Sequence, residues 1–268
     1  MKSFLKKYLP KRTFSLLSYF YRWNHNLYNF NSNFNYNLST NFSDFFIWSN
    51  DCSQIEFVAE NVRALIFGKE IEVAHNFRFF DEEGDFITNQ KYISSNFFEK
   101  IILQNPKGIG KYFSFIHFVE SETSLENILK FHEICEQNRG YTIYYPQDIN
   151  SVGATVHGNF GGLSKYNNKR AKMHLRKHIY TPIYKFQNYD KYDLVFNNPT
   201  KSDLKVKIII NESNETHHLN VPSLGTKFFK IEDYCGSISF ESSLPVCRPL
   251  VFKNPPPNSF GNFDVFHS

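Results

Sequence analysis

Two sets of residues in this sequence carry side chains that could do chemistry. The first set combines imidazole, amide, guanidinium and carboxyl groups, which can move protons or hold a reacting group; its members are His157, Asn159, Arg248, Asp264 and His267. The second set is a basic, tyrosine-containing segment at residues 165–185, whose cations and rings suit an anionic or carbohydrate-like ligand.

The basic segment lies in an acid-free part of the chain. Residues 149–189 contain seven Lys or Arg and no Asp or Glu. Because uncompensated cations repel one another, a negatively charged partner such as phosphate or a sulfated or carboxylated glycan explains them most simply. The ligand-binding residues predicted here are Lys169, Arg170, Lys172, Arg176, Lys177, Tyr166, Tyr180 and Tyr184. A solvated loop without a specific partner is the alternative.

The first set would have to be assembled from several strands. His157 and Asn159 stand at a strand end that runs into a glycine-rich turn at residues 158–162. A terminal strand would place Asp264 and His267 on opposite faces, so these two residues do not form a dyad within it. Either could meet Arg248 or His157 from another strand, which is the arrangement a hydrolase or transferase would need.

Common metal and cofactor signatures are missing from the sequence. It contains no H-E-x-x-H and no G-x-S-x-G, and the acids at residues 81–85 have their glycine at the wrong place for a calcium loop. We therefore expect no metal and no cofactor. The four cysteines are too widely spaced for a metal knuckle and too few for a disulfide framework, which favours a cytoplasmic over a secreted protein.

Composition and charge placement narrow the partners further. The 268 residues are 41% apolar and 21% charged, which is typical of a soluble globular chain. Of 30 basic residues six precede Trp23, and the remainder, 24 against 26 acids, is slightly acidic, so no specific nucleic-acid binding is expected. Residues 1–22 predict an arm that makes peripheral membrane contact or stays disordered, followed by an Asn-rich linker.

These residues must be positioned by strands, because the apolar pattern has period two over most of the chain. Alternation at residues 71–79 predicts a half-buried strand that turns at 81–85 into a hairpin. Residues 55–67 predict a strand broken at 60–61, residues 124–134 a short helix, and residues 189–268 seven short strands. Two further strands are predicted at 97–103 and 112–119.

The predicted fold class is mainly β, with two antiparallel β-sandwich halves, immunoglobulin-like or jelly-roll, joined by one short helix. The predicted division is a basic arm and linker at residues 1–43, a β-rich domain at 44–188 and a β-sandwich domain at 189–268. The leading hypothesis is a non-enzymatic protein that binds an anionic or carbohydrate-like ligand. The alternatives are a glycan-processing hydrolase or transferase and a structural or assembly protein, and the sequence leaves the oligomeric state open.

Overall fold

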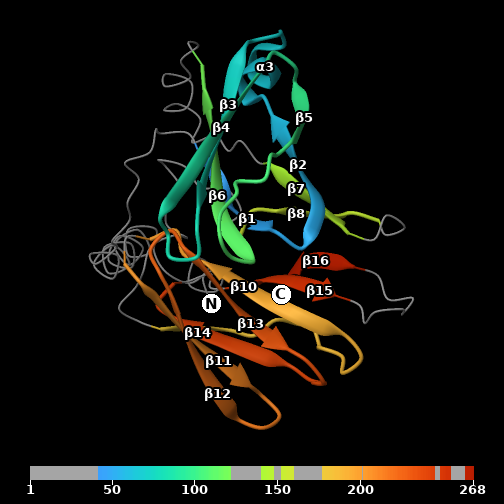
Figure 1. Cartoon of the computed structure of the whole chain (residues 1–268), viewed down its shortest axis with the longest axis vertical. Helices are drawn as coiled ribbons and strands as arrows, with labels where there is room; N and C mark the ends of the chain where they lie inside the picture. Colours follow the sequence, from blue (N-terminus) through green and yellow to red (C-terminus); the bar gives the residue numbers. More distant parts are fainter. Residues whose placement is uncertain are drawn as a thin grey trace, which may run out of the picture.

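Antiparallel strands dominate the chain in the computed structural model, where they form four four-stranded sheets that pack into two sandwich-like halves (Figure 1). The predicted mainly β fold is therefore confirmed, while the finer immunoglobulin-like or jelly-roll assignment stays a prediction. The helix predicted at 124–134 lies outside the described residues. The structure describes residues 42–121, 140–147, 152–159, 177–200, 202–244, 248–254 and 263–268.

The first half consists of two sheets that share one apolar interior. One sheet has the order β1-β6-β3-β4, with strands β1 (Phe42–Ser49), β6 (Tyr112–Glu120), β3 (Val73–Phe80) and β4 (Phe86–Ser94). The other has the order β5-β2-β7-β8, with strands β5 (Phe98–Ile102), β2 (Cys52–Glu60), β7 (Tyr141–Pro146) and β8 (Ala154–His157). The sequence predicted β3, β4, β5 and β6, whereas β1 and β7 carried no strand prediction.

The predicted hairpin between β3 and β4 is confirmed, and its turn is built as expected. Oδ1 of Asp81 accepts hydrogen bonds from the amides of Glu83 and Asp85, at 2.9 and 2.8 Å. Gly84 adopts φ +87°, and a Cβ there would lie 1.8 Å from the carbonyl oxygen of Ser223. The turn of the first half thus packs directly against a loop of the second half, and only glycine fits this approach.

The prediction of a strand at residues 55–67 is wrong beyond residue 61. There the short helix α3 (Val62–Phe67) follows β2. The side chain of Asn61 caps this helix by accepting from the amide of Ala64 at 3.1 Å, and Gly68 ends it at φ +62°. These two caps outweigh the strand preference of the apolar residues between them. Figure 1 shows α3 at the end of the molecule that faces away from the second half.

The second half contains the seven short strands predicted after residue 189. One sheet has the order β13-β10-β15-β16 and the other β12-β11-β14-β9. Their bounds are β13 (Thr226–Ile231), β10 (Lys191–Asn197), β15 (Leu250–Asn254), β16 (Asp264–His267), β12 (Glu215–Val221), β11 (Leu204–Ile210), β14 (Ile238–Ser242) and β9 (His178–Tyr180). The sequence predicted no strand at β9. The predicted boundary between the two domains, at residues 188 and 189, stays a prediction.

Apolar contacts continue from one half into the other. Phe45 and Phe118 of the first half belong to the same buried cluster as Phe196 of the second. Conversely, Phe252 and Val265 of the second half belong to a cluster formed mainly by the first. The two sandwiches therefore share buried surface. No helix in the described part of the chain is long and apolar enough to cross a membrane.

A polar network crosses the same junction around the buried carboxylate of Asp193. Lys111 Nζ lies 2.7 Å from Asp193 Oδ2 and 2.6 Å from Asp51 Oδ2, and the Tyr112 hydroxyl donates to Asp193 Oδ2 at 2.6 Å. Burial alone would lower the pKa of Lys111, but its hydrogen bonds to Asp193 and Asp51 more than offset this and raise it. The buried charge is thus compensated across the two halves.

Removing the cation of this network should destabilise the protein. In Lys111→Met the carboxylate of Asp193 stays buried without its ion-pair partner, so we expect the free energy of unfolding in denaturant to fall by about 3 kcal/mol. Lys91→Met is the matched control, because Lys91 and Glu120 are 3.8 Å apart and both about half exposed. An equal loss in both variants would contradict this role of Asp193.

Two histidines are buried in the interior of the first half. His75 Nδ1 and His117 Nε2 are 3.0 Å apart, and both side chains are inaccessible to solvent. Burial lowers the pKa of His75 to about 4 and that of His117 well below its usual value. Both imidazoles are therefore neutral core residues near pH 7.

This pair should make the fold sensitive to acid. As the pH falls below 6.5 the unfolded chain takes up protons on these histidines, whereas folded His75 resists protonation until about pH 4. The free energy of unfolding should therefore drop between pH 6.5 and 4, with about 3 kcal/mol from His75 alone. In the double variant His75→Phe, His117→Phe this slope should be shallower in pH-dependent denaturation, and an unchanged slope would contradict the account.

Candidate functional site

A second polar contact between the halves lies where β8 of the first meets β16 of the second (Figure 1). His157 ends β8 and His267 ends β16. The two rings are tilted with centroids 4.4 Å apart, and His267 Nε2 lies 3.2 Å from His157 Nδ1 and 3.0 Å from the His157 carbonyl oxygen. Each half therefore contributes one imidazole to this contact.

Three more side chains extend this contact. Arg248 Nε donates to the carbonyl oxygen of Asn159 at 3.4 Å, and Asn159 Nδ2 donates to Asn197 Oδ1 at 2.8 Å. Asn159 and Asn197 are both almost fully buried. We call the five residues the junction cluster: His157, Asn159, Asn197, Arg248 and His267.

The backbone of the first half holds the cluster in place. The amide of Asn159 donates to the carbonyl oxygen of Phe45 at 3.0 Å, which ties the end of β8 to β1. A Cβ on Gly158 would lie 2.4 Å from the Cβ of Asp44, so the close approach of these strands requires glycine. This explains the glycine between the two candidate residues His157 and Asn159.

Three buried polar atoms in the junction cluster have no hydrogen-bond partner among the described residues. They are Asn159 Oδ1, Asn197 Nδ2 and His267 Nδ1. An unsatisfied buried polar atom costs about 1–3 kcal/mol, so native proteins rarely gather several of them without something to bind. These atoms therefore retain hydrogen-bonding capacity that no described residue uses.

The neighbours of His267 indicate where the proton of its neutral ring lies. His267 Nε2 lies beside a carbonyl oxygen, so it carries the proton, and Nδ1 of the neutral ring is then an acceptor. Burial, followed by the charges of Arg248 and His157, lowers the pKa of His267 to about 3. The neutral ring therefore predominates at physiological pH. Its unsatisfied nitrogen can accept a hydrogen bond but is a very weak base.

Of the five candidate catalytic residues, the structure brings four together. Asp264 is exposed and its Oδ1 accepts from the amide of Val265 at 2.8 Å, so among the described residues it does not join the hydrogen bonds of the cluster. The sequence analysis missed Asn197, which lies within an apolar strand and before an Asn-Pro turn. Its type alone suggests a turn residue, and only the pairing with Asn159 gives it a place in the site.

The basic segment is described only at its C-terminal end. Tyr166, Lys169, Arg170, Lys172 and Arg176 lie outside the described residues. Lys177 forms an ion pair with Glu241, with Nζ 2.9 Å from Oε1, so its charge is compensated in part. The roles of all six residues in ligand binding stay predictions.

The two described tyrosines of this segment pack within the second half. The Tyr180 hydroxyl donates to the carbonyl oxygen of Ser268, and the ring stacks on Phe240 with centroids 6.4 Å apart. Tyr184 shares a hydrogen bond of 3.0 Å with the Tyr192 hydroxyl, and its ring lies 4.6 Å from that of Phe266. Stacking of these rings on a sugar stays a prediction.

Metal-ligating residues do not gather in the described part of the chain, where no three His, Cys, Asp or Glu side chains could hold one ion. Comparison of the chain with known protein families and with curated proteins finds no match. The functional argument therefore depends on the geometry of the site itself.

Removing the cation beside His267 should change the titration of this residue. In Arg248→Gln we expect the pKa of His267 to rise from about 3, because one of the positive charges that oppose protonation is gone. It should stay below 6.5, since burial, the largest cause, remains. Histidine ring resonances followed by NMR against pH would measure this. An unchanged pKa would contradict the contact, and Arg78→Gln on β3 is the control.

Proposed function

We propose that this protein is a non-enzymatic binding protein for an anionic, carbohydrate-like ligand, which occupies the junction cluster and is also held by the basic segment. The observation that carries the proposal is the set of three buried, unsatisfied polar atoms beside Arg248 and two histidines. The set includes one donor, Asn197 Nδ2, and two acceptors, Asn159 Oδ1 and His267 Nδ1.

This combination of donors and acceptors matches a particular ligand chemistry. The amide donor, together with the guanidinium charge nearby, suits the oxygens of a carboxylate, sulfate or phosphate. The two acceptors suit hydroxyl groups, which donate hydrogen bonds and are abundant on sugars. A sugar acid, or a sugar that carries phosphate or sulfate, offers both kinds of group within one small molecule.

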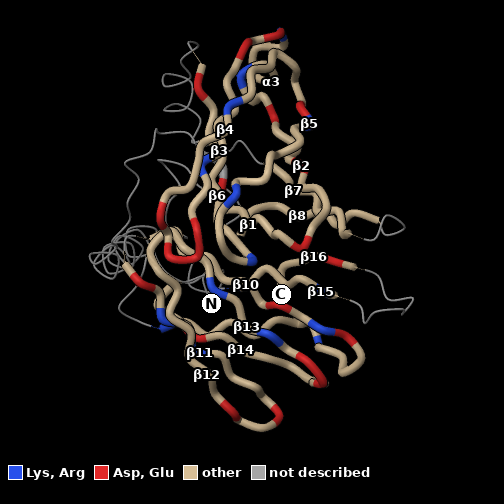
Figure 2. Tube along the Cα trace, viewed as in Figure 1, with Lys and Arg blue, Asp and Glu red and all other residues tan. Residues whose placement is uncertain are grey.

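The position of the basic segment supports the same ligand. Residues 160–176 are joined directly to Asn159 of the cluster, and they carry most of the cations in the acid-free part of the chain. In the described part of the two halves, by contrast, Lys and Arg are interspersed with Asp and Glu along the trace (Figure 2). We therefore infer that the basic segment is the part of the chain that attracts an anion over long range.

The convergence of four candidate catalytic residues favours a second candidate function, a glycan-processing hydrolase or transferase on the same scaffold. General acid–base catalysis works best with a pKa near the working pH. His267 has a pKa of about 3, so at neutral pH it would accept a proton poorly. Binding is therefore the better supported function, and a cytoplasmic location is part of the same proposal.

Reversal of charge in the basic segment should abolish anion binding. In the triple variant Lys169→Glu, Arg170→Glu, Arg176→Glu, retention on a heparin or phosphate resin should be lost at low salt, because attraction becomes repulsion. The control is Lys205→Glu, Lys207→Glu, Lys230→Glu, which makes the same charge change on β11 and β13. Circular dichroism would verify that both variants are folded.

The control variant should stay on the resin, eluting at somewhat lower salt. Equal retention of the wild type and the first variant would rule out the basic segment as a binding surface. Equal loss in both variants would show that only net charge matters. Turnover of a glycan substrate that disappears in His267→Gln would instead favour the enzyme.

A further inference from the structure

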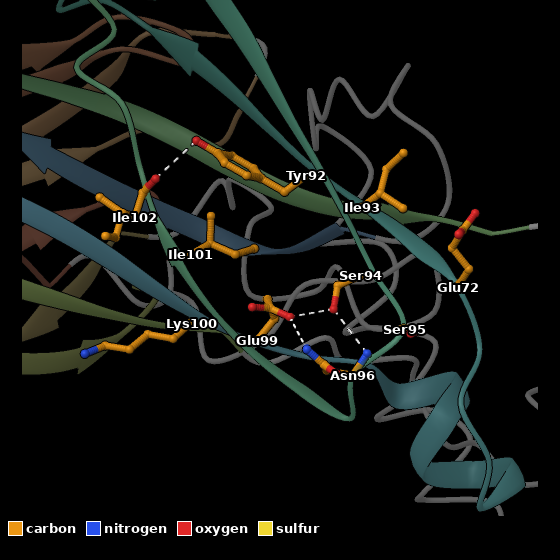
Figure 3. A pocket seen from close by; sticks show the side chains of 10 residues that line it. All are labelled: Glu72, Tyr92, Ile93, Ser94, Ser95, Asn96, Glu99, Lys100, Ile101 and Ile102. Atoms are coloured by element: carbon orange, nitrogen blue, oxygen red, sulfur yellow. Dashed lines mark hydrogen bonds between the residues drawn. The ribbon is translucent and has the colours of Figure 1, made fainter.

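Far from the junction cluster, a groove runs along β4 between the two sheets of the first half. Its larger cavity has a volume of about 620 Å³ and is lined by Glu72, by residues 92–96 and by residues 99–102 (Figure 3). A second cavity of about 370 Å³ is lined by residues 88–92 and 104–107. Both cavities include Tyr92, so they follow each other along the same strand.

The strands on either side of this groove are both sheet edges. Strand β4 is the last in the order β1-β6-β3-β4, and β5 is the first in the order β5-β2-β7-β8. Among the described residues, only β3 pairs with β4, so alternate amides and carbonyls of β4 face outward unpaired. Strand β4 has nine residues, with one lysine and no proline, and such a long edge readily accepts another strand.

Side-chain hydrogen bonds join the two walls of the groove beneath the edge of β4 at two places. The Tyr92 hydroxyl donates to the carbonyl oxygen of Ile102 at 3.2 Å, and Gln90 Nε2 donates to the carbonyl oxygen of Gln104 at 2.7 Å. Residues 88–94 of β4 line the two cavities over a length of roughly 24 Å at 3.4 Å per residue. That length suits a chain of about seven extended residues.

The end of the groove that contains the larger cavity is its wide end. This end combines apolar surface with negative charge. Ile93 and Ile102 line it and are 65% and 58% exposed. Glu99 accepts from Ser94 Oγ at 2.5 Å and from Asn96 Nδ2 at 2.6 Å, both on Oε2 (Figure 3). These bonds, that of Ser94 first, lower the pKa of Glu99, so it is ionised at neutral pH.

Oε1 of Glu99 has no partner among the described residues, whereas the lysine that lines the same cavity is already paired. Lys100 Nζ lies 2.6 Å from Glu56 Oε2, so its charge is balanced elsewhere. Glu72, which also lines the cavity, adds a second negative charge. The wide end of the groove therefore favours a positively charged group with an aliphatic neighbour.

We propose that this groove binds an extended peptide segment of a partner protein, which adds a strand to the edge of β4 and places a lysine or arginine side chain at Glu99. Main-chain hydrogen bonds to β4 provide the affinity, and Glu99 and the exposed isoleucines select the sequence. A small cation would fill only the wide end. The length of the groove and the open strand edge favour a peptide.

A synthetic peptide series tests this site on the full chain. The probes are acetylated, amidated heptapeptides of alternating Thr and Val, with Arg at each position in turn, and a matched series with Glu in place of Arg. Isothermal titration calorimetry should detect binding of at least one Arg peptide, with the matching Glu peptide about tenfold weaker or more. On binding, hydrogen exchange should slow at amides of β4.

Variants and backbone methylation give the decisive controls. Glu99→Gln should weaken the Arg peptide about tenfold, whereas Glu70→Gln, an equal charge change outside the cavity lining, should leave its affinity unchanged. N-methylation of the alternate peptide residues whose amides face β4 should abolish binding. N-methylation of the residues between them, whose amides face away from β4, should leave binding unchanged. The proposal is overturned if no peptide binds, if Glu99→Gln has no effect, or if acetyl-arginine amide binds as tightly as the heptapeptide.

Discussion

The compensation of one buried carboxylate determines how the two halves of this protein fit together. Asp193 on β10 is almost fully buried, and its Oδ2 is held by Lys111, which precedes β6, and by Tyr112, the first residue of β6. Because an uncompensated buried charge is very costly, β6 and β10 cannot separate or slide without large loss of stability. The apolar clusters shared by the halves act in the same direction, but they are less directional than this ion pair.

The candidate ligand site depends on that arrangement, because neither half contains it alone. His157 and Asn159 come from the first half, and Asn197, Arg248 and His267 come from the second. Their unsatisfied atoms are brought together only while β8 lies beside β16. The groove along β4, in contrast, belongs entirely to the first half. A disturbance at the junction should therefore affect the anion site more strongly than the groove.

Sequence patterning was sufficient for β3 and for the seven strands after residue 189, although burial alternates along only some of them, such as β11, and β10 is buried on both faces. It failed at α3, where apolar residues resemble a strand and the side-chain cap of Asn61 decides the conformation. It also gave no strand for β9, since three residues in a basic segment show no period. Four of the five candidate catalytic residues meet, but the sequence could not show that Asn197 joins them or that Lys177 pairs with Glu241. Such contacts depend on register between strands far apart in the chain.

The central claim is that the unsatisfied atoms of the junction cluster bind an anionic, sugar-like molecule. NMR of the full chain during titration with glucuronate tests it most directly, by following the side-chain amide of Asn197 and the ring of His267. The account predicts saturable shifts of both, with no change at the exposed amide of Asn220. Absence of a saturable shift at Asn197 and His267 with glucuronate, and equally with glucose 6-phosphate, would contradict it.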